Sequence, residues 1–420
     1  MINTDRHPCF NVAVKGECGR VHLPVAPKCN IMCNYCNRKY DCVNESRPGV
    51  TSAVLKPKQA IAYLEQVLEK EPRITVAGIA GPGDPFANPK ETLETIRLIR
   101  QRFPELLMCL ATNGLGLPPY LDDLAELQVS HVTLTVNAVD PEIGAKIYSW
   151  VRDGKVIYRG LKAAEVLLAR QLESIAGLKA RGITVKINTI IIPGVNDHHV
   201  QEVAKKMAEL GVDILNCMPM YPNADTPFGD VPEPQPEQMT GIRREAEKII
   251  PQMHHCTRCR ADAVGLLTAD RTDEFRGCLS ACATAVPAPA DRPYVAVATQ
   301  EGVLVNLHLG EAASFQVWGP KDGGFQMLEE RPAPRSGGGA DRWWTMAETL
   351  KDCRAVLVSG IGDTPAAVLS EAGVEPVVMN GFIEMALATI YGGGDLSGLK
   401  GRKLGVAGGC CSKKKGEGCG

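Results

Sequence analysis

The chain has 420 residues, of which 45% are hydrophobic and 22% are charged, a composition typical of a soluble globular protein. Its 46 basic and 48 acidic side chains leave a formal net charge of −2, so no global basic field favours nucleic acid or an anionic membrane. The N-terminus has no signal-like apolar segment, and no apolar run approaches the roughly 18 residues of a membrane-spanning helix. We therefore expect a cytoplasmic protein with no nucleic-acid or membrane partner.

Short apolar runs alternate with segments of helical period between about residues 20 and 250. The runs predict strands at 20–27, 73–80, 106–113, 131–138, 183–192 and 212–220, and the segments predict helices that include 57–70, 88–102, 159–180 and 197–210. Apolar strands that are each followed by a helix indicate a parallel sheet buried on both faces. Six such units are too few for a closed eight-fold barrel. We expect a partial (βα)6 barrel of the TIM type, with the chemistry at the carboxyl ends of the strands.

An Ala- and Pro-rich stretch divides the chain. Residues 284–293 (TAVPAPADRP) have the composition of a semi-rigid linker, and a second series of strand-like and helical segments follows. The Gly-, Lys- and Cys-rich C-terminal end has no apolar periodicity. We expect a first domain at 1–285, a linker at 286–292, a smaller α/β domain at 293–400 and a flexible tail at 401–420.

Cysteine is the unusual feature of the composition. The 16 cysteines include six before residue 43, four between residues 256 and 282, and three in the last eleven residues. In a chain without a secretion signal, clustered thiols favour metal ligation over disulfides.

Three cysteines after the first expected strand carry the clearest chemical signal. Cys29, Cys33 and Cys36 form a C-x3-C-x2-C motif, with Tyr35 just before the third cysteine. A zinc ribbon needs four ligands in a tetrahedron, usually from two C-x2-C pairs. Three thiolates from one short loop instead suit three corners of a [4Fe–4S] cube, whose open fourth iron can chelate S-adenosylmethionine (SAM). This spacing resembles the radical SAM enzymes, in which the cube cleaves SAM to a 5′-deoxyadenosyl radical.

Polar residues and glycines at the ends of later strands are candidates for binding SAM. Residues 78–85 (GIAGPGDP), with Gly81, Gly83 and Asp84, resemble the radical SAM segment that holds the SAM amino group. The other candidates, for its ribose or carboxylate, are Asn113, Thr135, Asn137 and Asn188. Each of these could equally be a turn or cap residue, and 78–85 could be an ordinary βα turn.

Four further motifs indicate which group of radical SAM enzymes the chain resembles. They are HPC at 7–9, RVHLPVAP at 20–27, DCVNESRPGV at 41–50 and CTRCRADAVG at 256–265. Together they resemble the NifB family of nitrogenase cofactor maturases, and the segment after the linker resembles the NifX-type cofactor-binding domain fused to many members. The resemblance implies an enzyme that fuses two [4Fe–4S] clusters, a SAM-derived carbide and an extra sulfur into the eight-iron precursor of the nitrogenase cofactor.

The same resemblance implies the ligands of the two substrate clusters. One set would be His22, Cys42 and Cys109, with Glu45 as a mobile carboxylate ligand, and the other would be Cys9, Cys256 and Cys259. From its residue type alone, His22 could be a core histidine and Cys109 a small buried hydrophobe. The implied cofactors are three [4Fe–4S] clusters and SAM. The implied partners are cluster donor proteins, an electron donor of the ferredoxin or flavodoxin type, and downstream cofactor carriers or scaffolds.

The remaining cysteines match no family ligand. Inert packing is expected for Cys18, Cys217, Cys278, Cys282 and Cys353. The tail cysteines Cys410, Cys411 and Cys419 could deliver iron or have no role, and His308 could contact the cofactor, as in related domains, or be a solvated surface residue.

Two other functions stay open at this point. A radical SAM peptide-modifying maturase also carries auxiliary clusters, but it holds them in a C-terminal extension, whereas Cys9, His22 and Cys42 lie within or before the expected barrel. A non-catalytic iron–sulfur carrier would not cleave SAM.

Overall fold

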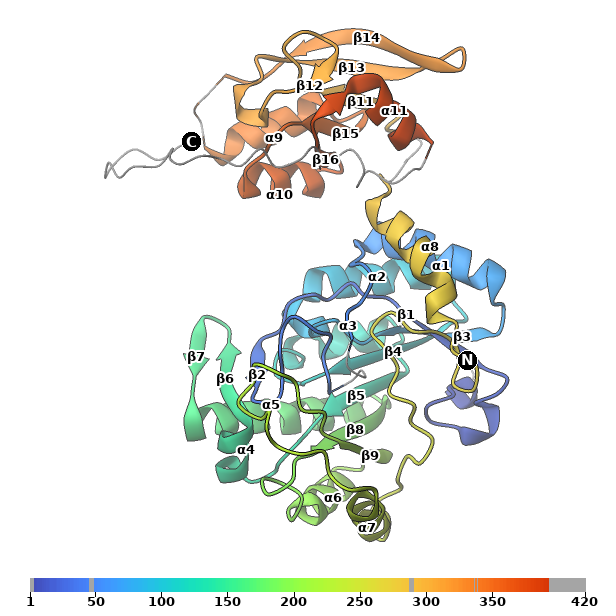
Figure 1. The fold of residues 1–420 in the computed structure, drawn as a ribbon, viewed down its shortest axis with the longest axis vertical. Helices are drawn as coiled ribbons and strands as arrows, with labels where there is room; N and C mark the ends of the chain where they lie inside the picture. Colours follow the sequence, from blue (N-terminus) through green and yellow to red (C-terminus); the bar gives the residue numbers. More distant parts are fainter. Residues whose placement is uncertain (1–3, 45–48, 287–290, 336, 338, 393–420) are drawn as a thin grey trace, which may run out of the picture. The chain divides into compact units, whose positions relative to one another are not determined.

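The computed structural model describes residues 4–44, 49–286, 291–335, 337 and 339–392 (Figure 1). The chain divides into two compact units between Ala283 and Thr284. Glu45, residues 287–290 of the expected linker and the expected tail at 401–420, with its three cysteines, lie outside the described residues. Among the described helices, none is both long and apolar enough to cross a membrane.

The first unit is built on a seven-stranded sheet in the order β10-β1-β3-β4-β5-β8-β9. Its parallel strands are β1 (Gly19–His22), β3 (Ile74–Ile79), β4 (Leu107–Thr112), β5 (His131–Thr135), β8 (Thr184–Ile191) and β9 (Ile214–Pro219). These are the six expected strands in chain order, and the partial (βα)6 barrel is confirmed. The first strand is shorter than expected and ends at His22, five residues before Pro27.

Four short strands of this unit were not expected. β10 (Val264–Leu266) pairs antiparallel with β1 at the edge of the main sheet. A separate three-stranded sheet joins β2 (Ile31–Cys33), β6 (Tyr148–Asp153) and β7 (Val156–Tyr158). Three of the four have only three residues, which is too short for a period of two to be recognised in the sequence. The smaller sheet matters for the site because β2 contains Cys33.

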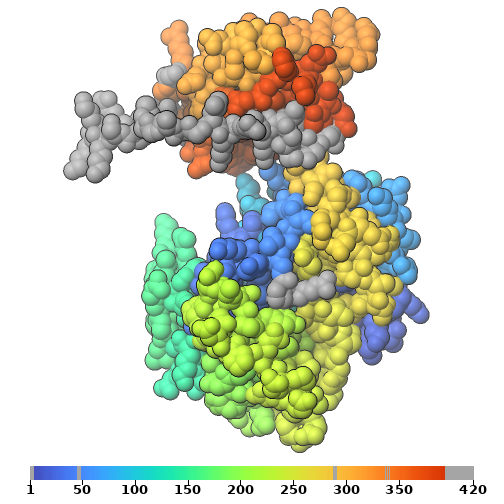
Figure 2. All heavy atoms as spheres, in the orientation of Figure 1, coloured from blue at the N-terminus to red at the C-terminus, as the bar shows by residue number. Residues whose placement is uncertain are grey.

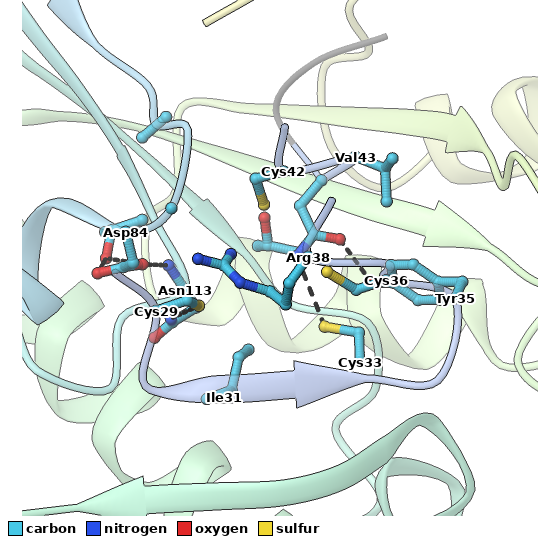
Figure 3. Close-up of a pocket in the computed structure, with 15 residues that line it drawn as sticks. Cys29, Ile31, Cys33, Tyr35, Cys36, Arg38, Cys42, Val43, Asp84 and Asn113 are labelled. Carbon is cyan, nitrogen blue, oxygen red and sulfur yellow. Dashed lines mark hydrogen bonds between the residues drawn. The ribbon is translucent and has the colours of Figure 1, made fainter. Parts of the chain in front are cut away.

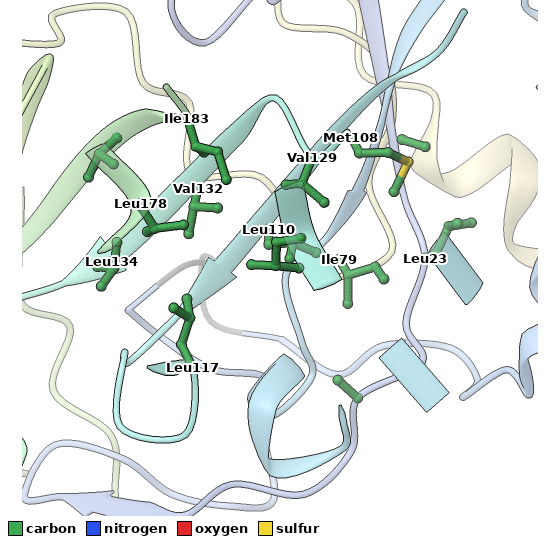
Figure 4. Close-up of a cluster of buried hydrophobic side chains, with 14 of the residues drawn as sticks. Leu23, Ile79, Met108, Leu110, Leu117, Val129, Val132, Leu134, Leu178 and Ile183 are labelled. Carbon is green, nitrogen blue, oxygen red and sulfur yellow. The ribbon is translucent and has the colours of Figure 1, made fainter. Parts of the chain in front are cut away.

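Helices pack against the outer face of the main sheet. The expected helices are present as α1 (Pro57–Lys70), α2 (Pro89–Arg102), α5 (Gly160–Ala180) and α6 (Val200–Glu209), and the others are α3 (Leu121–Glu126), α4 (Pro141–Ile147), α7 (Pro236–Glu247) and α8 (Thr272–Thr284). Several begin with a proline in the first turn, where its missing N–H leaves no helical hydrogen bond unmade. Figure 4 shows the resulting core, in which Leu110, Val132 and Leu134 of the strands cluster with Leu178 of α5.

The second unit is a mixed α/β domain. Its five-stranded sheet has the order β14-β13-β11-β15-β16. These strands are β11 (Tyr294–Val297), β13 (Ser314–Lys321), β14 (Gly324–Pro332), β15 (Cys353–Val358) and β16 (Glu375–Val378). A short pair, β12 (Leu304–Val305) and β17 (Gly381–Phe382), and the helices α9 (Ala340–Thr349), α10 (Asp363–Glu371) and α11 (Ile383–Tyr391) complete it. Cys353 is fully buried in its core.

Two loops of the first unit are tied together directly before the cysteine motif. The backbone N–H of Gly83 donates to the carbonyl of Ala26 at 2.6 Å, and that of Asp84 donates to the carbonyl of Lys28 at 2.8 Å. The side chain of Asn88 accepts from the N–H of Lys28 at 3.2 Å and donates to its carbonyl at 2.9 Å. A Cβ atom on Gly83 would lie 2.1 Å from the Lys28 carbonyl oxygen. Glycine therefore permits the contact that positions the chain just before Cys29.

We expect Gly83→Ala to destabilise the first unit by about 1–3 kcal/mol, because the new methyl group must displace backbone atoms of Lys28. Gly277→Ala in α8 is the matched control, since a Cβ there would meet no atom within 4 Å beyond the adjacent backbone of its own helix. A helical alanine should be neutral or stabilise by up to about 1 kcal/mol. Urea denaturation of the two apoproteins measures the difference, and equal midpoints would contradict the tight contact.

Candidate active site

Side chains alternate along the barrel strands between the helical core and the barrel interior. In β4, Met108 and Leu110 belong to the core that contains side chains of α2 and α5. Cys109 and Ala111 alternate with them and line an interior cavity instead. The neighbouring strands follow the same rule, and their inward-facing residues are Arg20, His22, Val76, Thr133, Lys186, Asn188, Asn216 and Met218. The barrel interior is therefore lined by polar side chains and by thiol and imidazole groups that can bind metal, although the strand sequences are almost entirely apolar.

A first cavity contains the cysteine motif. Cys29, Cys33 and Cys36 line it, and Figure 3 shows their sulfur atoms around the same space, with Arg38 between them. Its empty volume is about 410 Å³. Cys33 is placed by β2, and the other two cysteines lie in the turns on either side of this strand.

Four of the expected SAM-binding residues line this first cavity. They are Gly83, Asp84, Asn113 and Thr135. The remaining three lie elsewhere: Asn188 lines the second cavity, and Gly81 and Asn137 line neither of the two. Asn137 is buried, and its side-chain amide donates to the Tyr35 hydroxyl at 2.7 Å and accepts from the N–H of Ile190 at 2.9 Å.

Asp84 is occupied by hydrogen bonds within the protein. Its carboxylate accepts from the N–H groups of Phe86 at 2.9 Å and Asn113 at 2.7 Å, and from the Thr112 hydroxyl at 2.9 Å. Burial raises its pKa above the usual range, although these donors oppose the shift. The geometry indicates that Asp84 holds the loops after β3 and β4 in position beside Cys29.

The three thiols of the motif are protonated at neutral pH when they bind no metal. Burial raises the pKa of all three thiols. The pKa of Cys29 is raised to about 12, and the negative charge of Asp84 adds to the shift of this thiol. Amide nitrogens of Asn113 and Asn44 lie 3.8 Å from the sulfurs of Cys29 and Cys33, respectively. Such thiols ionise when they bind a metal, which releases their protons. Three thiols of one short segment that line the same cavity fit the [4Fe–4S] cube of a radical SAM enzyme.

No three His, Cys, Asp or Glu side chains among the described residues lie close enough to share one metal ion. Ligands of a cube bind different iron atoms, so they need not converge on a point.

The loop after β9 packs over the cysteine motif. The side chain of Asn223 donates to the Tyr35 carbonyl at 2.9 Å, and the N–H of Phe228 donates to the Asn34 carbonyl at 3.0 Å. Figure 2 shows this yellow-green segment beside the blue N-terminal segments on the surface of the first unit. A segment far away in the sequence thus helps to hold the motif in place.

A second cavity adjoins the first, since Ala111 lines both. Its empty volume is about 610 Å³. Most of the expected substrate-cluster ligands line it, namely Cys9, His22, Cys109, Cys256 and Cys259. Cys42 lines the first cavity instead, beside the cysteine motif. The structure therefore brings together five soft ligands from three distant segments of the chain.

His22 is oriented to bind a metal through Nε2. Its Nδ1 lies 2.8 Å from the Arg260 carbonyl oxygen, which can only accept, so Nδ1 carries the proton and Nε2 is left with its lone pair. Burial, reinforced by the charge of Arg20, lowers its pKa to about 4. The ring is consequently neutral at neutral pH, in the tautomer typical of histidine ligands whose other nitrogen is held by a carbonyl.

Buried cations give the second cavity a positive character. Arg20 is 1% exposed, and its Nε–H donates to the sulfur of Cys259 at 3.2 Å, while an ion pair links it to Asp270 at 3.3 Å. Lys186 and Arg258 are also buried and line the cavity, and no Asp or Glu is among the described residues that line it. The cavity therefore suits an anionic guest such as a thiolate-bound cluster.

Sequence reasoning missed these cations and His7, which also lines the second cavity. Lys186 could have been recognised, because it alternates with Val185 and Ile187 in a strand whose other face is apolar. Arg258 lies in a loop and carries no periodic signal.

Two family models match the chain, that of the Radical SAM superfamily at residues 23–215 and that of the Dinitrogenase iron-molybdenum cofactor family at residues 292–393. The FeMo cofactor biosynthesis protein NifB of Chlorobaculum tepidum is 53% identical over 401 residues, which cover 95% of each chain. NifB of Klebsiella pneumoniae is 40% identical over 413 residues, which cover 89% of this chain and 86% of that protein. Among solved structures, methylornithine synthase (PylB) matches with a TM-score of 0.37 and 14% identity, over 60% of this chain and 75% of that one.

These relatives confirm the family that the motifs around the cysteines predicted, and the second unit is the expected NifX-like domain. The chain belongs to the NifB family of FeMo cofactor biosynthesis proteins and is a radical SAM iron–sulfur enzyme.

Proposed function

We propose that this enzyme fuses two [4Fe–4S] substrate clusters with a SAM-derived carbide and an extra sulfur into an eight-iron precursor of the nitrogenase cofactor. The observation that carries the proposal is the pair of adjoining cavities. One holds the cysteine motif, and the other gathers five soft ligands around a buried positive interior. A radical generated in the first cavity would need to travel only into its neighbour.

In the first cavity, Cys29, Cys33 and Cys36 would hold the resident cube, which supplies the electron that cleaves SAM. Asn113 and Thr135 offer polar side chains to SAM at the ends of β4 and β5, and Gly83 keeps the backbone close. Asp84 fixes these loops through its hydrogen bonds to Thr112 and Asn113. The buried setting excludes water from the reacting atoms.

In the second cavity, Cys9, Cys256 and Cys259 would hold one substrate cluster, with Arg20 donating to Cys259. His22 and Cys109 would hold the other, with Cys42 reaching it from the first cavity and Glu45 as its mobile ligand. A neutral imidazole binds iron less strongly than a thiolate does, which favours later release of the product.

In the proposed reaction, one SAM transfers its methyl group to a sulfide of one substrate cluster and leaves as S-adenosylhomocysteine. The deoxyadenosyl radical from a second SAM then takes a hydrogen atom from that methyl group and leaves as 5′-deoxyadenosine. Loss of the remaining protons and fusion of the two cubes with the extra sulfur complete the precursor. The NifX-like domain would hold the product or pass it to carrier and scaffold proteins.

We expect single cysteine variants to separate the partial reactions. Cys29→Ala should abolish formation of 5′-deoxyadenosine, because the resident cube loses a ligand. Cys256→Ala should keep SAM cleavage but form no eight-iron product. Cys18→Ala is the control, since this buried cysteine lines neither cavity. Chromatography of the nucleoside products and electron paramagnetic resonance of the cluster product measure both steps, and SAM cleavage by Cys29→Ala would refute the assignment.

We expect anaerobic reconstitution to load about 12 irons per chain, as three cubes of four. Cys29→Ala and Cys256→Ala should each load fewer, because each loses a ligand of a different cube. Iron analysis against protein concentration gives the count. A fully active protein that saturates at about four irons would show that the second cavity holds no substrate cluster.

We expect a chain that ends at residue 285 to form the eight-iron product in vitro at close to the rate of the full chain, because every proposed ligand precedes this residue. Iron loading shows whether the shortened chain is folded. If it loads fully but forms no product, the NifX-like domain takes part in the chemistry.

A further inference from the structure

The second cavity is lined by several buried polar atoms that have no partner within the protein. Among the described residues, such atoms include His7 Nε2, Asn216 Oδ1 and Arg258 Nε, and all three side chains line this one cavity. His7 is 2% exposed. Because an unpaired buried donor or acceptor costs free energy, these atoms point to a polar guest that completes their hydrogen bonds.

The hydrogen bond at the other ring nitrogen determines what His7 offers to that guest. The backbone N–H of Cys9 donates to His7 Nδ1 at 3.2 Å. Nδ1 must therefore have its lone pair free, and the proton of the imidazole lies on Nε2. A protonated Nε2 can donate a hydrogen bond but cannot bind iron. His22 is in the opposite state, because its Nδ1 faces a carbonyl oxygen.

Packing holds the His7 ring in this orientation. The ring meets Phe10 edge-on, with centroids 4.8 Å apart and planes at 78°, and its centroid lies 4.3 Å from that of His131. The Thr75 hydroxyl donates to the carbonyl of Arg6, the preceding residue, at 2.9 Å. The ring is thus fixed from both sides, which makes Nε2 a preorganised donor.

We propose that His7 donates a hydrogen bond from Nε2 to a sulfur of the substrate cluster that Cys9, Cys256 and Cys259 hold, and so positions that cluster and raises its reduction potential. This inference rests on the proposed function, which places a cluster in the second cavity. One turn of the chain then supplies both a thiolate, from Cys9, and a donor to the same cluster. Reduction adds negative charge to the cluster, so an N–H donor at its sulfur favours the reduced form.

Two variants of His7 separate its two nitrogens. His7→Asn retains an oxygen near the Nδ1 position, which can still accept from the Cys9 N–H, but it cannot reach the Nε2 position. His7→Gln retains a donor near the Nε2 position. His131→Phe is the control, because it alters the packing of the same ring without a change in the residues that line the cavity.

The test uses the full chain, reconstituted anaerobically without SAM. Iron content and a redox titration followed by electron paramagnetic resonance are measured for each variant. His7→Asn should load as much iron as the wild type, and one cluster should become harder to reduce by about tenfold, which is 59 mV for one electron. His7→Gln and His131→Phe should have potentials close to that of the wild type.

Two results would overturn the role of His7. A loss of about four irons by His7→Asn, with His131→Phe fully loaded, would make His7 a ligand rather than a donor. Unchanged potentials for every cluster in His7→Asn would show that Nε2 contacts none of them. Failure of the proposed function is recognised separately, since the wild type itself would then load a single cube, and the inference would fall with it.

Discussion

The site depends on the alternation of side chains along parallel strands that are covered on one face by helices and on the other by the barrel interior. Residues with one parity, such as Leu110 and Val132, bury apolar surface against the helices and stabilise the sheet. Residues with the other parity, such as Cys109, Lys186 and Asn216, are then free to differ in chemistry without weakening that core. A slip of one residue in a strand would exchange the two sets, so the same burial that folds the barrel fixes the ligands inside it.

Hydrogen bonds to backbone groups decide what each polar side chain in the interior can do. A carbonyl of Arg260 and an N–H of Cys9 select opposite tautomers of two histidines that line one cavity. His22 thereby presents a lone pair and His7 presents a proton at the chemically equivalent atom. Residue type alone does not distinguish these two roles. The guanidinium group of Arg20 is likewise oriented by hydrogen bonds to the carbonyls of Gly265 and Leu266. In this orientation it also donates to the sulfur of Cys259.

The sequence predicted the parallel strands, their order along the chain and the cysteine motif, because apolar periodicity and close spacing are local properties. Of the seven residues predicted to bind SAM, four line the cavity of the cysteine motif. Asn137 does not line it, because its amide group donates to the Tyr35 hydroxyl, and only the three-dimensional partners distinguish such a contact from ligand binding. Asn188 lines the neighbouring cavity, and its amide donates to the carbonyl of Asn44. Arg258 donates to the carbonyl of Val43, 215 residues away in the sequence, and the His7 ring packs against His131 of β5, so no local pattern encodes either contact.

The two cavities of the proposed reaction meet at Ala111. Its small side chain lines both cavities, so the wall between the cysteine motif and the soft ligands is thin at this point. Cys42 lines the cavity of the cysteine motif, whereas the other ligands with which it was grouped, His22 and Cys109, line the neighbouring cavity. The proposed chemistry therefore requires a substrate cluster that reaches across the boundary at Ala111 if Cys42 is to bind the same cluster as His22 and Cys109. A cluster held in this way by two thiolates and an imidazole is bound less strongly than one held by three thiolates, which suits a cluster that must later leave.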